Sequence, residues 1–230
     1  LTFHHNLNLS YIHHFGFGDL QAAARYENRL APSKDLQWLD NTLTLNDIFT
    51  HRYWTGALMA SYDCLPVSSL RLYAEFEYAY TSMNGRNIHD FLPRAMIEWH
   101  PDAEALLSLR YDKLLVRPSL NYLNPAEVRE PLAIRSGNGD IVGMHLHKVS
   151  FDFGWKFPSL SAHLNASYLY TKDGFNAIWM ERGNIRIYKW GNEGVRHAVS
   201  ITPSLKIKAS GTTDINAGVS ALWDKRIAES

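Results

Sequence analysis

Residues 69–81, "SLRLYAEFEYAYT", decide the fold class, because apolar and charged residues alternate along them. Successive side chains of a β-strand point to opposite faces of its sheet. One face of such a strand would carry Leu70, Leu72, Ala74, Phe76, Tyr78 and Tyr80, and the other Arg71, Glu75, Glu77 and Thr81. The stretch therefore predicts a strand with one apolar and one charged face.

The same period of two recurs along most of the chain. Residues 148–157, "KVSFDFGWKF", and 161–171, "SAHLNASYLYT", repeat the alternation closely. Weaker copies cover residues 6–15, 20–29, 52–64, 91–100, 104–116, 194–208 and 213–224. These segments predict about ten strands of roughly 9–13 residues, whereas strands of globular proteins usually have about 5–6. A tilted strand that crosses a bilayer needs about 9–11 residues.

The connections between these segments differ in length. Short turns fall at 16–19, 65–68, 101–104, 158–161 and 210–213, and long connections at 30–51, 83–90, 117–144 and 172–193. Outer-membrane barrels have short turns on one side and long loops on the other. Aromatic residues at the ends of the apolar faces, as membrane interfaces favour, point the same way. We therefore expect an all-β, antiparallel up-and-down transmembrane β-barrel, with a soluble β-sandwich as the rival fold.

Composition narrows the classes of function. The chain of 230 residues has 23 basic and 23 acidic residues, so its charge does not favour nucleic acid as a partner. The single cysteine, Cys64, excludes an internal disulfide framework and a cysteine-type zinc site. No apolar run is long enough for a transmembrane helix. The chain begins at Leu1 without a signal-peptide pattern, so we interpret it as an excised piece.

The segment "LSLRYDKLLVRPSLNYLNPAEVREPLAIRSGNGDI", residues 107–141, resembles the signature of the TonB-dependent-receptor-like outer-membrane β-barrel family. In that family a strand ends in Arg-Pro-Ser and leads to Leu-Asn-Pro and then Gly-Asn-Pro. The matching positions are Arg117, Pro118, Ser119, Leu123, Asn124, Pro125, Pro131, Gly137 and Asn138. The pattern departs at Gly139, where the family usually has proline, and at Ala126, where it has an aromatic residue.

The resemblance implies a barrel of about 22 strands closed around a plug, of which residues 1–230 form a single barrel segment without the plug domain. It further implies a Gram-negative outer membrane, lipid around the barrel, and uptake of an unknown nutrient ligand. The energy would come from a TonB-type protein that contacts parts absent from this chain. The similarity is firm over residues 50–190 and looser elsewhere.

Charged residues on the predicted strands are candidates for a lumen wall. These candidates are Arg71, Glu75, Glu77, Arg110 and Asp112. Paired carboxylates also perform acid–base catalysis, but nothing else marks a substrate cleft. His4-His5, His13-His14 and His145-x-His147 lack a carboxylate or cysteine at ligand spacing. We therefore expect no catalytic, metal or cofactor-binding residues, and no cofactor.

Two alternative functions remain open. A small self-contained barrel, acting as a pore or as an enzyme at its outer rim, would use the loose candidates His89, Asp90, Asp112 and His145. A soluble all-β carbohydrate-binding module would use exposed Trp and Tyr residues. The module predicts that the aromatic row at 149–157 is buried in a core, and the barrel predicts that it is exposed.

Overall fold

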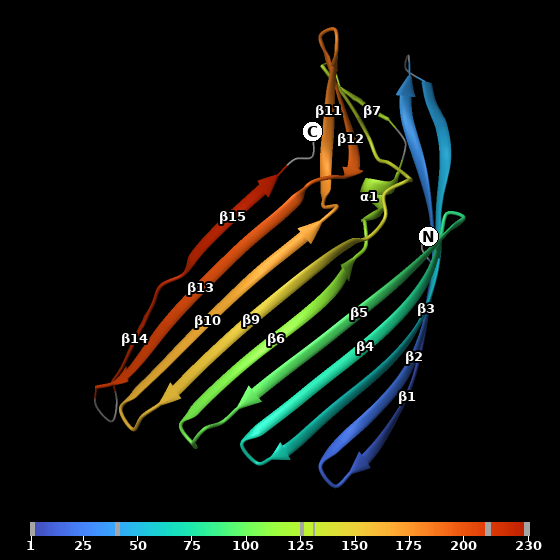
Figure 1. The fold of residues 1–230 in the computed structure, drawn as a ribbon. Helices are drawn as coiled ribbons and strands as arrows, with labels where there is room; N and C mark the ends of the chain where they lie inside the picture. The colour runs from blue at the N-terminus through green and yellow to red at the C-terminus, as the bar shows by residue number, and fades with distance from the viewer. Residues whose placement is uncertain (1–2, 40–41, 125–126, 131, 210–212, 228–230) are drawn as a thin grey trace.

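A computed structural model of the chain describes residues 3–39, 42–124, 127–130, 132–209 and 213–227. Its main feature is one curved, open antiparallel sheet in which neighbours along the chain lie side by side (Figure 1). The strands are β1 (Phe3–Phe15), β2 (Gly18–Leu39), β3 (Thr42–Val67), β4 (Leu70–Met83), β5 (Arg86–Trp99), β6 (Ala105–Val116), β9 (Met144–Lys156), β10 (Leu160–Lys172), β13 (Val195–Lys208), β14 (Asp214–Gly218) and β15 (Ala221–Ile227).

β14 and β15 form one strand with an interruption. Both pair with β13 in a single register, with Ser204 opposite Gly218 and Ile201 opposite Ala221. The interruption lies opposite Pro203, which has no N–H to donate to the ladder. The up-and-down sheet is therefore confirmed, with ten strand positions when β14 and β15 are counted together. Within the described residues the sheet does not close on itself, as expected for a part of a larger barrel.

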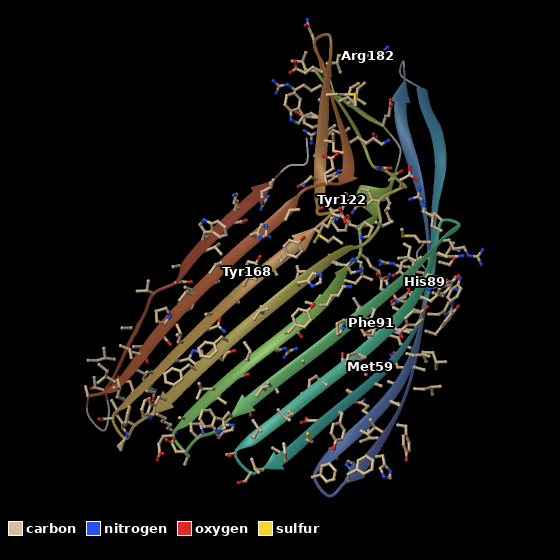
Figure 2. The ribbon with its side chains drawn as sticks, viewed as in Figure 1. Met59, His89, Phe91, Tyr122, Tyr168 and Arg182 are labelled. Atoms are coloured by element: carbon tan, nitrogen blue, oxygen red, sulfur yellow. The ribbon has the colours of Figure 1, made fainter. Side chains whose placement is uncertain are left out.

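The two faces of the sheet are reversed relative to a soluble protein. On β4, Phe76 is 52% exposed and Glu75 only 5%. We call the side of Phe76 the apolar face and the side of Glu75 the polar face. Phe91, labelled in Figure 2, lies on the apolar face of β5 and is 51% exposed. Trp155 and Phe157 are 41% and 44% exposed, so the buried row that the carbohydrate-binding module requires is absent from residues 149–157.

Four of the expected short turns occur within a few residues of 16–19, 65–68, 101–104 and 158–161, and residues 210–212 of the fifth lie outside the described residues. Two of the long connections were predicted wrongly. Residues 83–90 are no loop, because β4 and β5 continue to a tight turn at Asn84 and Gly85, both with positive φ (50° and 82°). An Asn-Gly pair in this conformation forms the two-residue hairpin turn that matches strand twist. Residues 30–51 are also mostly strand, because β2 and β3 run on as one extended hairpin.

The other two long connections carry structure of their own. Residues 117–144 contain α1 (Leu120–Leu123), β7 (Val128–Glu130) and β8 (Ala133–Ser136), and residues 172–193 contain β11 (Phe175–Arg182) and β12 (Ile185–Asn192). These strands form a second sheet in the order β11-β12-β8-β7, in which β8 and β12 are parallel. In the described part of the chain, no helix has the length and apolar character needed to cross a membrane.

Candidate functional site

Ion pairs line the polar face of the sheet. Glu77 on β4 accepts a hydrogen bond of 2.5 Å from Arg25 on β2, across β3. Glu75 lies 2.9 Å from Arg94 on β5. Both carboxylates are buried, and a charge removed from water is tolerated when an opposite charge compensates it. The predicted strand faces are therefore correct, and each acid is paired with a base from another strand.

The other predicted wall residues have nearby partners. Arg71 donates two hydrogen bonds to Asp63 on β3, at 2.9 and 2.6 Å. Arg110 does the same to Asp112 on its own strand, at 2.8 and 2.9 Å. Sequence reasoning joined Arg110 with Asp112 but missed Asp63. A correct register for the β3–β4 hairpin, in which Asp63 stands opposite Tyr73, would have found it.

Arg117 anchors the signature segment on the polar face. It follows the last residue of β6, and its guanidinium donates to the Thr81 hydroxyl on β4 at 3.1 Å. The same guanidinium lies 5.7 Å from the ring centre of Tyr53 on β3, within cation–π distance. Thr81 in turn lies 3.0 Å from Thr55, hydroxyl to hydroxyl. The chain leaving β6 is thus fastened across β5 to the two strands beyond it.

The Asn124 and Gly137 ends of the signature segment are bonded to each other. Gly137 N donates to Asn124 O at 2.7 Å, and Asn138 N donates to Tyr122 O at 2.6 Å. A Cβ on Gly137 would lie 2.2 Å from Asn124 O, so a glycine is required by space. Leu123, next to Asn124, is 1% exposed. We call residues 117–144 the strap, because among its described residues Arg117 is tied to the polar face and the Asn124 and Gly137 ends are tied to each other.

The remaining signature positions have smaller parts in the strap. Pro118 is half-buried, and Ser119 O accepts a hydrogen bond of 3.0 Å from Tyr122 N at the start of α1. A Cβ at Gly139, where the family pattern has proline, would meet nothing closer than 3.9 Å, so the departure leaves no steric conflict. Pro125, Ala126 and Pro131 lie outside the described residues.

The strap lies where the sheet divides. The β5–β6 ladder extends only from Arg94–Asp112 to Trp99–Leu107 and stops at Pro93, which has no N–H to continue it. Beyond this point Asp90 on β5, 2% exposed, lies 2.7 Å from His145 Nε2 at the start of β9. The contact between Asp90 and His145 brings together two of the four residues that the rim-enzyme alternative requires. The other two stay apart, since the Tyr78 hydroxyl is hydrogen-bonded to His89 and Asp112 is paired with Arg110.

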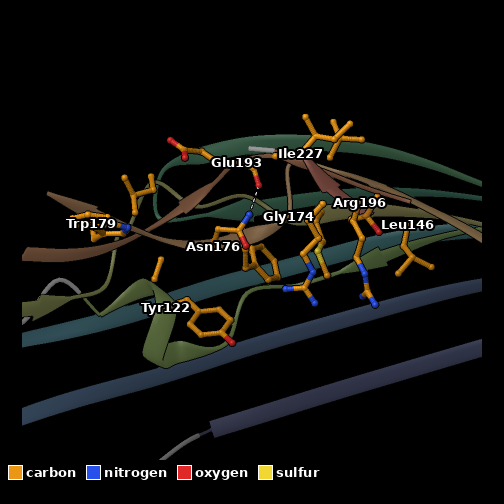
Figure 3. A pocket seen from close by; sticks show the side chains of 16 residues that line it. Tyr122, Leu146, Gly174, Asn176, Trp179, Glu193, Arg196 and Ile227 are labelled. Carbon is orange, nitrogen blue, oxygen red and sulfur yellow. Dashed lines mark hydrogen bonds between the residues drawn. The ribbon is translucent and has the colours of Figure 1, made fainter. Parts of the chain in front are cut away.

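A cavity of about 700 Å³ opens between the strap and the second long connection. Tyr122 of α1 stands on one side, and Asn176, Glu193 and Arg196 stand on the other (Figure 3). Tyr122 packs against Trp190, with 4.1 Å between ring centres. Asn176 donates to Glu193 O at 2.5 Å, which holds the base of the β11–β12 hairpin together. The cavity combines aromatic surface with charged groups of both signs.

Among the described residues, no group of three or more His, Cys, Asp or Glu side chains is placed to hold a metal ion. Several of the paired histidines contact a carboxylate or a tyrosine hydroxyl instead of a metal site. His4 lies 3.2 Å from Glu27, and His14 lies 2.8 Å from Asp19. His147 is hydrogen-bonded at 2.8 Å to the Tyr111 hydroxyl.

Comparison with known proteins identifies the family. The family model described as "Outer membrane protein beta-barrel family" matches residues 70–230. The chain belongs to this family. The expected resemblance and the location in the Gram-negative outer membrane are therefore confirmed. No curated protein sequence matches the chain.

Solved structures of outer-membrane receptors share the fold at low sequence identity. The siderophore receptor PirA from Pseudomonas aeruginosa has a TM-score of 0.76 at 11% identity. The match covers 99% of this chain and 43% of PirA. A double mutant of the ferric enterobactin receptor PfeA from the same species has a TM-score of 0.72 at 13% identity, covering 96% of this chain and 35% of PfeA. The iron transporter FrpB from Neisseria meningitidis has a TM-score of 0.69 at 10% identity, covering 99% and 36%. The chain thus spans less than half of each receptor.

Proposed function

We propose that this chain is part of the barrel of a TonB-dependent receptor that takes up a scarce or bulky nutrient through the outer membrane. The proposal rests on the family match and on the likeness to receptors and transporters for siderophores and iron. Because the chain spans only part of those receptors, a TonB-type protein would contact regions outside it. The chain itself acts as a scaffold and carries out no catalysis.

The height of the apolar face is the observation that carries this proposal. On β5, ten residue steps separate His89 from Trp99, both on the apolar face. At about 3.3 Å per residue this is roughly 33 Å along the strand, or about 25 Å of height at a tilt near 40°. The apolar band of outer-membrane barrels is about 25 Å tall. Exposed apolar side chains of this extent are stable in lipid and unfavourable in water.

The polar face would then line the lumen. Its wall would include Arg71, Glu75, Glu77, Arg110 and Asp112, held in ion pairs that keep the charges fixed. The strap lies on this side of the sheet, and the cavity beside Tyr122 opens at the same end of the strands. In this position the strap and the β11–β12 hairpin contact an incoming ligand before it reaches the plug.

The size and location of the native product test the proposal. An antibody raised against residues 117–144 is used on outer-membrane fractions separated on a denaturing gel, and the detected protein is tested for co-purification with the periplasmic domain of TonB. We expect a band several times larger than 26.3 kDa that binds TonB. A band near 26 kDa without TonB binding would contradict the proposal and favour a small self-contained pore or enzyme.

A further inference from the structure

The apolar face ends in a row of basic and aromatic side chains on one half of the sheet. Cross-strand neighbours follow each other from β6 to β15 in direct register. The row is Lys113, His147, Tyr170, His197 and Lys225. Lys172 stands two residues beyond Tyr170 on β10. We call these six residues the basic border.

Coming from the short turns, the border is the first row of the apolar face with charged side chains, and Leu115, Val195 and Ile227 follow it in the next row. The next row toward the short turns is Tyr111, Val149, Tyr168, Val199 and Trp223. Below it, every residue on the apolar face of β6, β9, β10, β13, β14 and β15 is apolar. Aromatic side chains at the end of an apolar band lie at the level of lipid headgroups. The basic border therefore begins where the headgroups begin.

The lysines of the border have no ion-pair partner among the residues that the structure describes. The ion pairs among described residues do not include Lys113, Lys172 or Lys225. The apolar face of these strands contains no Asp or Glu in the described residues. Lys206 on the polar face differs, since its Nζ lies 2.8 Å from Asp214. The border thus presents positive charge to whatever surrounds the barrel.

Two histidines of the border are hydrogen-bonded to tyrosine hydroxyls through Nδ1. The Tyr111 hydroxyl lies 2.8 Å from His147 Nδ1, and the Tyr168 hydroxyl lies 2.7 Å from His197 Nδ1 (Tyr168 is labelled in Figure 2). When a tyrosine O–H donates to Nδ1, a neutral imidazole carries its proton on Nε2. Each ring then has an N–H available next to a lysine or tyrosine, which suits an anionic oxygen ligand.

We propose that the basic border binds the phosphate groups of a phosphorylated glycolipid in the outer leaflet of the membrane. The border lies at the ends of the strands from which the strap and the β11–β12 hairpin emerge, and long connections face the cell exterior in such barrels. Basic side chains at headgroup level attract anionic lipids. This surface lies on the opposite face from the nutrient path and goes beyond the proposed function.

The other half of the sheet provides an internal contrast. On β1 to β5 the end of the apolar face carries the uncharged Asn28, Ser82 and Asn87 together with His5, Arg52 and His89, and it has none of the three lysines of the basic border. The proposal therefore places the lipid on one side of the barrel segment, against β6 to β15, rather than uniformly around it.

The test uses the full-length protein in nanodiscs that contain bis-phosphorylated lipid A, and native mass spectrometry counts the lipid A retained. The test variant combines Lys113→Gln, Lys172→Gln and Lys225→Gln. The matched control combines Lys148→Gln, Lys156→Gln and Lys206→Gln, three lysines on the polar face of the neighbouring strands β9 and β13. One lost charge near an anionic surface corresponds to about a fivefold loss of affinity. We expect the test variant to bind lipid A at least about tenfold more weakly, and the control to bind it normally.

Three outcomes would overturn the proposal. One is unchanged lipid A binding by the test variant, with its barrel still folded by heat-modifiable migration on a gel. A second is an equal loss in the polar-face control. The third is equal retention of dephosphorylated lipid A by the wild-type protein, which would show that phosphate is not recognised. Millimolar inorganic phosphate should displace little lipid, and full displacement would identify free phosphate as the ligand instead.

Discussion

The two faces of β4 obey opposite rules although their residues are neighbours in the chain. Phe76 is 52% exposed and stacks on Phe91, with 5.8 Å between ring centres, whereas Glu75 and Glu77 are buried in ion pairs. In a soluble sheet the aromatic residues would be covered and the carboxylates would be solvated. The difference teaches that the burial of a side chain must be interpreted together with the solvent that its face meets. In the proposed barrel the apolar face meets lipid and the polar face meets the lumen.

The largest expected effect comes from a charge on the apolar face. Phe153→Arg places a guanidinium among Leu107, Leu164 and Trp155, in the middle of the apolar rows. We expect a loss of about 2–4 kcal/mol in the free energy of unfolding, as for arginine near the bilayer midplane. Guanidinium titration of the full-length protein refolded into lipid vesicles measures it.

The matched control places the same charge on the polar face. His163→Arg lies beside Gly154 on the strand paired with β9, and the native side chain is 53% exposed. We expect a change within about 0.5 kcal/mol. Equal effects of the two variants would mean that the assignment of the faces is wrong.

A smaller effect is expected where the strap is tied on the polar side. Gly137→Ala directs a methyl group at Asn124 O, and the backbone there must shift at a cost of about 1–3 kcal/mol. We expect faster limited proteolysis within residues 117–144 while the barrel stays folded. Gly139→Ala is the control, because its new methyl group meets nothing closer than 3.9 Å. Equal protease resistance of both variants would show that the close contact between Gly137 and Asn124 does not hold the strap in place.

Breaking one ion pair tests how firmly the polar face is held. Glu77→Gln keeps the shape of the side chain but leaves Arg25 without its counter-charge. Since the Arg25 side chain is 46% exposed, water compensates part of the loss, and we expect about 1–2 kcal/mol of destabilisation. The same unfolding titration measures it, and high salt should leave the wild-type value nearly unchanged. A neutral result would show that the lumen charges are independent of stability.

The smallest effect is expected at the rim, where the two faces meet. Gly85→Ala introduces a Cβ at φ of 82°, in open space, so only backbone strain of about 1 kcal/mol applies. The β4–β5 hairpin should persist, with a small drop in unfolding free energy. Loss of the hairpin, detected by faster amide exchange of Thr81 and Ile88, would show that the turn directs the pairing of these strands.

Much of the fold could be predicted because the period of two is a local signal. It placed Leu70 and Glu75 on opposite faces and located the ten strand positions without any tertiary information. The connection at 83–90 was predicted wrongly because its length was taken as evidence, although the Asn84-Gly85 pair is itself the hairpin signal. Turn chemistry should have outweighed the apparent irregularity.

The candidate site was less accessible to prediction, because its contacts join distant strands. Arg25 meets Glu77 across β3, and Arg117 meets Thr81 across β5. Such contacts depend on the register of several successive hairpins, and no local pattern encodes them. The strap residues were recognised from a resemblance, but their steric reason, the close approach of Gly137 to Asn124, emerges only in three dimensions.

The parallel pairing of β8 with β12 links two surface loops whose sequences are separated by the β9–β10 hairpin. Ala133 to Ser136 align with Arg186 to Lys189, so an insertion in one loop would shift its partner out of register. Variation in one loop should therefore be accompanied by compensating variation in the other. With the loops on the cell exterior, as we propose, an antibody or a phage would meet them as a single discontinuous epitope, which a short peptide from either loop cannot mimic.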